Sequence, residues 1–110
     1  MIDTTKDLQL RQRLSDEFGE EQSVLILDLF CSSVGIELNK VRQSAEAQNQ
    51  RRLLHNSRGL RGVCQSVFVD DMAQTCQHIE SAAGLLDWPL VTVLVARLEG
   101  EFESLRNQYQ

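Results

Sequence analysis

The amino-acid sequence predicts an all-α fold, an antiparallel four-helix bundle with a short additional N-terminal helix. Apolar residues recur at spacings of three and four along every long segment, and no segment alternates convincingly with a period of two. Four amphipathic segments follow one another through short turns, which favours antiparallel packing of neighbours. The chain has 110 residues, 42% of them hydrophobic and 25% charged, so we expect one domain over residues 1–110.

The first predicted helix is short and carries a thin apolar stripe. Asp3 or Thr4 is its expected N-cap, and Gly19 stands where a left-handed C-terminal stop is expected. A thin stripe buries little surface, so this helix is expected to pack as a cover on the bundle. The stripe consists of Leu8, Leu10, Leu14 and Phe18.

The second and third predicted helices form the first half of the bundle. The second begins near Glu20 and ends between Ala45 and Asn49, and the third runs from about Asn49 to Ser66. The expected core stripe of the second helix is Val24, Leu27, Phe30, Val34, Leu38 and Val41. The expected core face of the third is Leu53, Ser57, Leu60, Cys64 and Val67.

The fourth and fifth predicted helices complete the bundle. Asp70 is the expected cap of the fourth helix, which Gly84 and the turn Asp87-Trp88-Pro89 close, because proline is tolerated in a first turn and poorly further in. The apolar face of the fourth helix is Met72, Cys76, Ile79 and Ala83. The fifth carries Val91, Leu94, Leu98, Phe102, Leu105 and Tyr109.

Charge and cysteine content argue against several classes of function. Eleven Lys plus Arg against sixteen Asp plus Glu give a net charge of −5, whereas nucleic-acid and anionic-membrane binders need a basic field. Three cysteines without a C-x-x-C pair indicate neither a disulfide framework nor a zinc site, and His78 has no partner at metal spacing. No apolar run approaches the roughly 20 residues of a membrane span, and no signal peptide is visible. We therefore expect a cytoplasmic protein without a metal.

The third helix presents an unusual face opposite its core stripe. An imidazole is followed one turn later by a cation, with two glycines beside them, although two glycines in a helix cost about 1.5 to 2 kcal/mol relative to alanine. Stability does not require this arrangement, so it suggests a partner that approaches the backbone closely. The face consists of Arg51, His55, Arg58, Gly59, Gly62 and Ser66.

The charges around this face favour phosphoryl chemistry. No acidic residue occurs between Glu46 and Asp70, and the same interval holds Arg51, Arg52, Arg58 and Arg61. An exposed neutral imidazole is a good nucleophile towards phosphorus, and guanidinium groups stabilise a bound phosphoryl group. The pattern suits a surface histidine that accepts and donates a phosphoryl group. A weak nucleic-acid contact is disfavoured because no aromatic residues are interleaved with the arginines.

The segment His55-Asn56-Ser57-Arg58-Gly59 resembles the H-x-x-K/R-G signature of histidine-containing phosphotransfer (Hpt) domains of two-component signalling. Two further stretches are similar to the family: Glu17 to Glu21 leading into Leu27 to Phe30, and Cys76 to Glu80. The resemblance implies a monomeric helical bundle that takes a phosphoryl group from a receiver-domain aspartate and passes it to another.

The resemblance also assigns roles to residues. It implies that His55 is phosphorylated, that Arg58 contacts the phosphoryl group, and that Gly59 and Gly62 belong to an open receiver-docking surface. The basic surround of Arg51, Arg52 and Arg61 also suits docking onto an acidic receiver pocket. Its expected partners are the receiver domain of a response regulator, a hybrid histidine kinase, or both. The chain would carry the phosphoryl group without autonomous catalysis and bind no cofactor, and the receiver would supply Mg²⁺.

Two alternatives stay open from the sequence. Leu60 and Arg61 stand where the family usually has small residues, and about three extra residues precede the fourth helix. These departures favour a non-phosphorylated helical module that binds and regulates a receiver domain or histidine kinase with the same face. A homodimeric structural adaptor is the other alternative, and only amphipathic helices support it.

Overall fold

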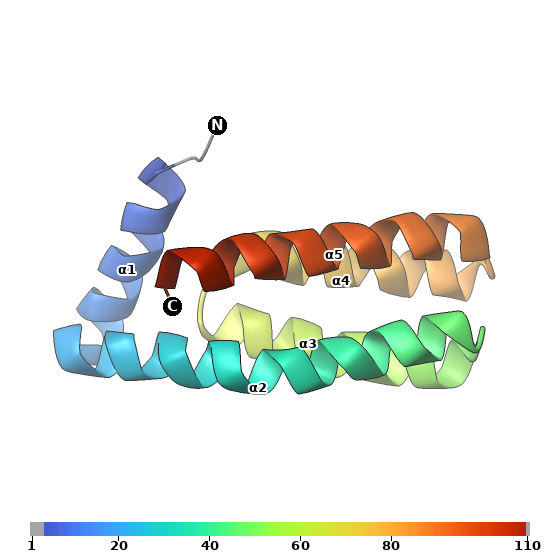
Figure 1. Ribbon diagram of the computed structural model, residues 1–110, viewed down its shortest axis with the longest axis horizontal. Coiled ribbons are helices and arrows are strands. Elements are labelled where there is room, and N and C mark those ends of the chain that lie inside the picture. The colour runs from blue at the N-terminus through green and yellow to red at the C-terminus, as the bar shows by residue number, and fades with distance from the viewer. Residues whose placement is uncertain (1–3, 110) are drawn as a thin grey trace.

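The computed structural model describes the backbone of residues 4–109 and the side chains of residues 10–108, and this part of the chain is all-helical. The helices are α1 (Thr4–Phe18), α2 (Glu20–Glu46), α3 (Gln50–Ser66), α4 (Asp70–Gly84) and α5 (Trp88–Tyr109) (Figure 1). The cap candidate Asp3 lies outside the described residues, and the side chains of the cap candidate Thr4 and of the core candidates Leu8 and Tyr109 lie outside the described side chains. The predicted helix boundaries are otherwise within a few residues of those observed.

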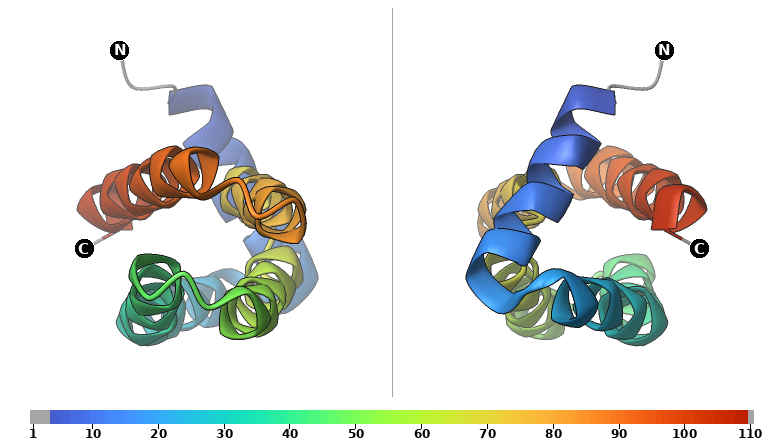
Figure 2. Two further views of the ribbon diagram at one scale, coloured as in Figure 1. Left: turned by 90° about the vertical axis from the view of Figure 1, so that its right-hand side faces the viewer. Right: turned by 90° about the vertical axis from the view of Figure 1, so that its left-hand side faces the viewer.

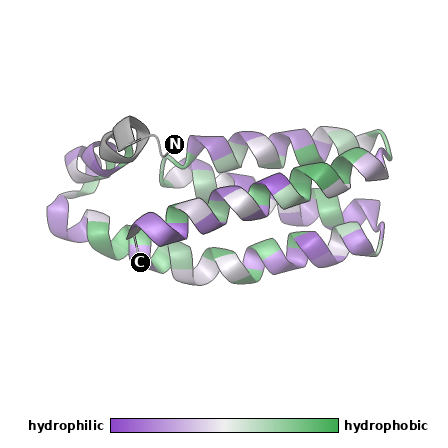
Figure 3. Ribbon diagram, turned by 45° about the horizontal axis from the view of Figure 1, so that its top comes forward, coloured by the Kyte–Doolittle hydropathy of each residue, from purple (hydrophilic) through white to green (hydrophobic). Residues whose placement is uncertain are grey.

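Helices α2 to α5 form an up-and-down bundle. Each packs on its neighbour in the chain, and α5 packs back on α2, so that α3 and α5 lie diagonally opposite one another. The end-on views show this four-cornered arrangement, with α1 crossing one end of it (Figure 2). Hydrophobic and hydrophilic residues are mixed along each helix, as expected when one face is buried and the other exposed (Figure 3).

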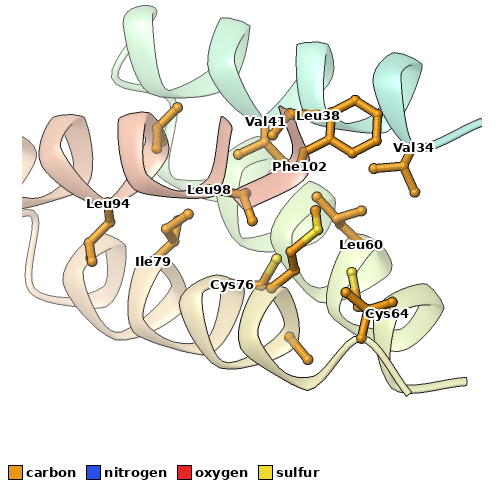
Figure 4. Close-up of a cluster of buried hydrophobic side chains, with 14 of the residues drawn as sticks. Val34, Leu38, Val41, Leu60, Cys64, Cys76, Ile79, Leu94, Leu98 and Phe102 are labelled. Atoms are coloured by element: carbon orange, nitrogen blue, oxygen red, sulfur yellow. The ribbon is translucent and has the colours of Figure 1, made fainter. Parts of the chain in front are cut away.

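The core is built from the predicted stripes of the four bundle helices. Side chains from α2, α3, α4 and α5 converge on the bundle axis (Figure 4). The fully or almost fully buried members include Val34, Val41, Leu53, Leu60, Cys64, Met72, Cys76, Ile79, Val91 and Leu98. This match confirms the assignment of the apolar faces from their spacing.

Among the described members of the predicted stripes, Leu10 and Val67 are partly buried and two others are exposed. Val24 is 58% exposed and Phe18 is 42% exposed. The buried positions at the start of α2 are Ser23 and Leu27. Here α1 packs on α2 and covers the side of the helix that carries Ser23, rather than the neighbouring side that carries Val24. The hydroxyl oxygens of Ser15 and Ser23 lie 3.4 Å apart at that contact. The prediction that Val24 belongs to the core was therefore wrong.

The predicted helix ends are partly correct. Gly19 has a φ of 88°, as a glycine stop requires, but its ψ of 157° is extended rather than left-handed helical, and its N–H donates to the Ser15 carbonyl at 2.8 Å. The expected cap Asp70 is instead the first residue of α4, and Val69 is the N-cap. The Asp70 carboxylate accepts a hydrogen bond from Arg13 of α1 at 3.0 Å, which ties α1 to the bundle.

Candidate functional site

His55 lies on the exposed face of α3, about a turn and a half from the start of the helix. Asn49 caps this helix by accepting a hydrogen bond from the Arg52 N–H at 3.1 Å. Gln50 donates to the Ala83 carbonyl of α4 at 3.0 Å and so holds the first turn of α3 against the bundle. Leu53 is fully buried on the opposite face, which directs the His55 side of the helix to solvent.

Asn56, the residue after the histidine, fixes α3 against α2. Its side-chain nitrogen donates to the Ser44 hydroxyl at 2.8 Å and to the Lys40 carbonyl at 3.3 Å. Ser44 is buried and its hydroxyl donates in turn to the same Lys40 carbonyl at 2.7 Å. This network joins α3 to α2 directly beside His55, and it favours the rotation of α3 that leaves the histidine exposed.

A groove of about 350 Å³ runs between α2 and α3 beside His55. The residues around it are Lys40, Gln43, Ser44, Ala47, Asn49, Arg52, His55 and Asn56. Two of these side chains, Lys40 and Arg52, are cationic, and no carboxylate lines the groove. Glu37 lies outside it and pairs with Lys40 at 3.4 Å. The surface on this side of the histidine is therefore basic.

A carboxylate from α4 lies on the other side of the site. The Arg58 Nε donates to Oε1 of Glu80 at 3.3 Å, and the Arg61 Nε lies 2.8 Å from Oε2. The second contact does not meet hydrogen-bond geometry, although both of its atoms are shielded from water, so it is an ion pair without a hydrogen bond. Although residues 47–69 include no acidic residue, the face of α3 therefore lies against a negative charge from α4.

The five arginine and glycine positions predicted to dock a receiver are not equally exposed. Arg51 and Arg52 are exposed near the start of α3, whereas Arg61 is 31% exposed and pairs with Glu80. Gly59 and Gly62 are exposed, and a Cβ built on either meets nothing within 4 Å. Packing within the chain therefore does not require these two glycines, which leaves an open surface next to His55.

Sequence reasoning missed two features of this face. Glu80 was missed because its partners lie on another helix, although an acidic residue one turn after the core position Cys76 was visible in the sequence. The second feature is a set of exposed apolar residues on α2. Leu29, Ile36 and Gln43 are spaced by seven and so share one face, and Gln43 lines the groove beside His55. Both apolar side chains are more than half exposed.

The remaining candidates belong to the core or to the surface. Cys31, Cys64 and Cys76 are free and buried. Burial raises the pKa of both the Cys64 and the Cys76 thiol to about 12, so neither forms a reactive thiolate near neutral pH. The described residues include no group of His, Cys, Asp or Glu that could hold a metal ion. None of the described helices has the length and hydropathy of a membrane span.

Comparison with known proteins identifies this arrangement. The family model for the Hpt domain matches residues 25–108, which contain all four bundle helices from the first core turn of α2 onward. The chain belongs to the Hpt domain family. It is an Hpt-domain phosphotransfer protein of two-component phosphorelays, and Hpt domains act with receiver domains and histidine kinases.

A solved structure is similar to this Hpt domain in fold. It is histidine-containing phosphotransfer protein B (HptB) from Pseudomonas aeruginosa PAO1, with a TM-score of 0.80 and 19% sequence identity over 92% of this chain and 87% of that one. At this identity the likeness concerns the fold. None of the curated proteins compared with the chain matches it.

The departures from the family pattern do not obstruct the exposed face. Leu60 is fully buried between the helices, and Arg61 leans towards α4 to pair with Glu80. A larger side chain at each position is therefore accommodated by the core or by the neighbouring helix. The surface around His55, Gly59 and Gly62 stays open.

Proposed function

We propose that His55 is the residue through which this Hpt domain relays a phosphoryl group between receiver-domain aspartates. The observation that carries the proposal is the exposed imidazole on α3, followed one turn later by Arg58 and bordered by two exposed glycines. His78, the other histidine, lies exposed on α4 within the sequence Gln-His-Ile-Glu and has neither a glycine nor an arginine within four residues. His55 is the stronger candidate for this reason.

The transfer is a displacement at phosphorus. An unprotonated imidazole nitrogen of His55 attacks the phosphorus of a receiver aspartyl phosphate, a nitrogen–phosphorus bond forms, and the bond from phosphorus to the aspartate oxygen breaks. The electron pair of that bond returns to the aspartate, which leaves as a carboxylate. The reverse sequence delivers the group to a second receiver. Because His55 is exposed, the imidazole is accessible to either partner.

The neighbouring residues prepare the surface for this step. Arg58 lies three residues from His55, a spacing at which side chains on a helix are neighbours, and its guanidinium is the proposed ligand of the phosphoryl oxygens. Arg51 and Arg52 supply a positive field towards the acidic pocket of a receiver, and Arg61, although paired with Glu80, completes the proposed docking surface. Gly59 and Gly62 allow the receiver to approach the helix backbone without side-chain clash.

The chain supplies the nucleophile and the docking surface, and the receiver supplies the rest. We propose that Mg²⁺ and the carboxylates that bind it belong to the receiver, and that this chain catalyses no reaction alone. We also propose that the protein acts as a monomer in the cytoplasm. A single monomeric mass by size-exclusion chromatography with light scattering is the expected result, and a dimer would instead favour the structural-adaptor alternative.

Transfer from a radiolabelled receiver tests this function. The chain is incubated with a phosphorylated receiver domain and Mg²⁺, and the acid-labile, base-stable label on the chain is measured. We expect label on the wild type and on His78→Gln, the matched control, and none on His55→Gln. Tight binding of a receiver without any label on the wild type would overturn the proposal in favour of a docking module that is not phosphorylated.

A further inference from the structure

The carboxylate of Glu80 is the polar group of the site that no expected role explains. It projects from α4 towards α3 and is only 13% exposed, and it faces two guanidinium groups rather than one. Its Oε1 contacts Arg58 and its Oε2 contacts Arg61. A carboxylate so removed from water needs cationic partners to remain charged, and both arginines are needed to occupy its two oxygens.

The two arginines that contact Glu80 differ in their exposure to solvent. Arg61 is 31% exposed and lies against the carboxylate oxygen that is shielded from water, so it serves as the permanent counter-ion. Arg58 is 63% exposed and contacts Glu80 through Nε, one of the five N–H donors of a guanidinium. The contact with Glu80 therefore does not use the N–H donors on the terminal nitrogens of Arg58.

We propose that Glu80 is a positioning residue, which holds Arg58 by its Nε so that the terminal nitrogens are ready for the phosphoryl group on His55. This inference rests on the proposed function of His55 and adds a residue from α4 to the site. A long arginine side chain on a helix surface is otherwise free to sample many rotamers. A carboxylate that restrains it reduces the ordering that must occur when the phosphoryl group arrives.

The negative charge of Glu80 and its positioning of Arg58 have opposite effects on the transfer rate. The direction in which the transfer rate changes when Glu80 is replaced therefore tests the inference. Glu80→Gln removes one negative charge from the site and, by charge alone, strengthens attraction to an acidic receiver and to a phosphoryl group. Loss of the restraint on Arg58 acts in the other direction. We expect the positioning effect to dominate: transfer from a phosphorylated receiver slows about 3- to 10-fold in Glu80→Gln, and phosphohistidine hydrolysis accelerates by a similar factor, as for loss of one charge-assisted hydrogen bond.

The test combines this variant with Arg58→Ala and with a matched control. Glu103→Gln breaks an exposed ion pair with Arg106 on α5 at 2.7 Å and changes net charge equally, diagonally across the bundle from α3. It should leave both rates unchanged. In the Arg58→Ala background, Glu80→Gln should add no further loss, because Glu80 acts through Arg58. Circular dichroism confirms that each variant is folded.

The outcomes separate this inference from the proposed function. If the wild type carries label on His55 but Glu80→Gln transfers as fast as the wild type or faster, the positioning role is refuted and the proposed function stands. An equal loss from Glu80→Gln in the presence and absence of Arg58 also refutes it. If the wild type accepts no label, the proposed function fails, and the positioning role, which rests on it, is overturned as well.

Discussion

Gly59 separates the needs of the fold from those of the docking surface. It is exposed inside α3, and a Cβ there meets nothing within 4 Å, so Gly59→Leu adds a side chain to open solvent. Replacing glycine by leucine in a helix interior stabilises the folded state by about 0.8 kcal/mol, since the unfolded backbone loses freedom. Unfolding entropy of roughly 2.1 cal/mol/K per residue converts this, over 110 residues, to a rise in Tm of about 3 °C. The same side chain stands where a receiver would approach His55, so we expect transfer to slow about tenfold or more.

The assay for Gly59→Leu pairs thermal unfolding with the rate of phosphoryl transfer from a receiver. Gly100→Leu is the control, because Gly100 also meets nothing within 4 Å but lies on α5, diagonally opposite α3. Both variants should show a similar rise in Tm, and only Gly59→Leu should show a slower phosphoryl transfer. Equal transfer rates in the two variants would refute the argument that the glycine keeps the docking surface open. A fall in Tm of Gly59→Leu would refute the assignment of Gly59 to open solvent.

Two further predictions concern the core. The Ser57 hydroxyl is fully buried and has no hydrogen-bond partner. Ser57→Ala should therefore raise the free energy of unfolding, measured in urea, by about 1 kcal/mol. A decrease in the free energy of unfolding would show that the hydroxyl is hydrogen-bonded. Burial raises the pKa of the Cys64 and Cys76 thiols from an ordinary 9.0 to about 12. Above pH 9 the thiols of the unfolded chain lose their protons, while those of the folded chain keep them until about pH 12. The stability that the two thiols contribute is therefore complete below pH 9 and is lost as pH rises towards 12. Denaturation curves between pH 8 and about 11 should therefore show falling stability that a Cys64→Ala, Cys76→Ala double variant shows less, and an equal fall in both proteins would contradict this cause.

The bundle was predictable because helix spacing and burial obey the same geometry. The apolar positions of α4, for example Met72, Cys76 and Ile79, are separated by four and three residues, and all three are buried as expected. The exposed side of α3 followed from the same rule, which placed His55 and Arg58 on the surface. These predictions needed only information within one helix.

The features that were missed depend on contacts between helices. Val24 is exposed because α1 sets the buried side at the start of α2, and the order of the sequence does not give the angle at which α1 packs. The ion pairs of Glu80 join residues more than eighteen positions apart, so the charge of the α3 face could not be read from α3 alone. The one-residue shift from Asp70 to Val69 at the α4 cap is a matter of local backbone geometry.

Mapping the phosphorylated residue is the measurement that tests the proposed role of His55 most directly. After transfer from a phosphorylated receiver, the chain is digested at neutral to basic pH and the phosphopeptides are mapped by mass spectrometry. We expect one phosphoryl group, on His55, and no phosphoryl group on a folded His55→Gln protein. Phosphate on His78 or on an acidic residue, or a receiver that binds without transferring its phosphoryl group, would contradict it.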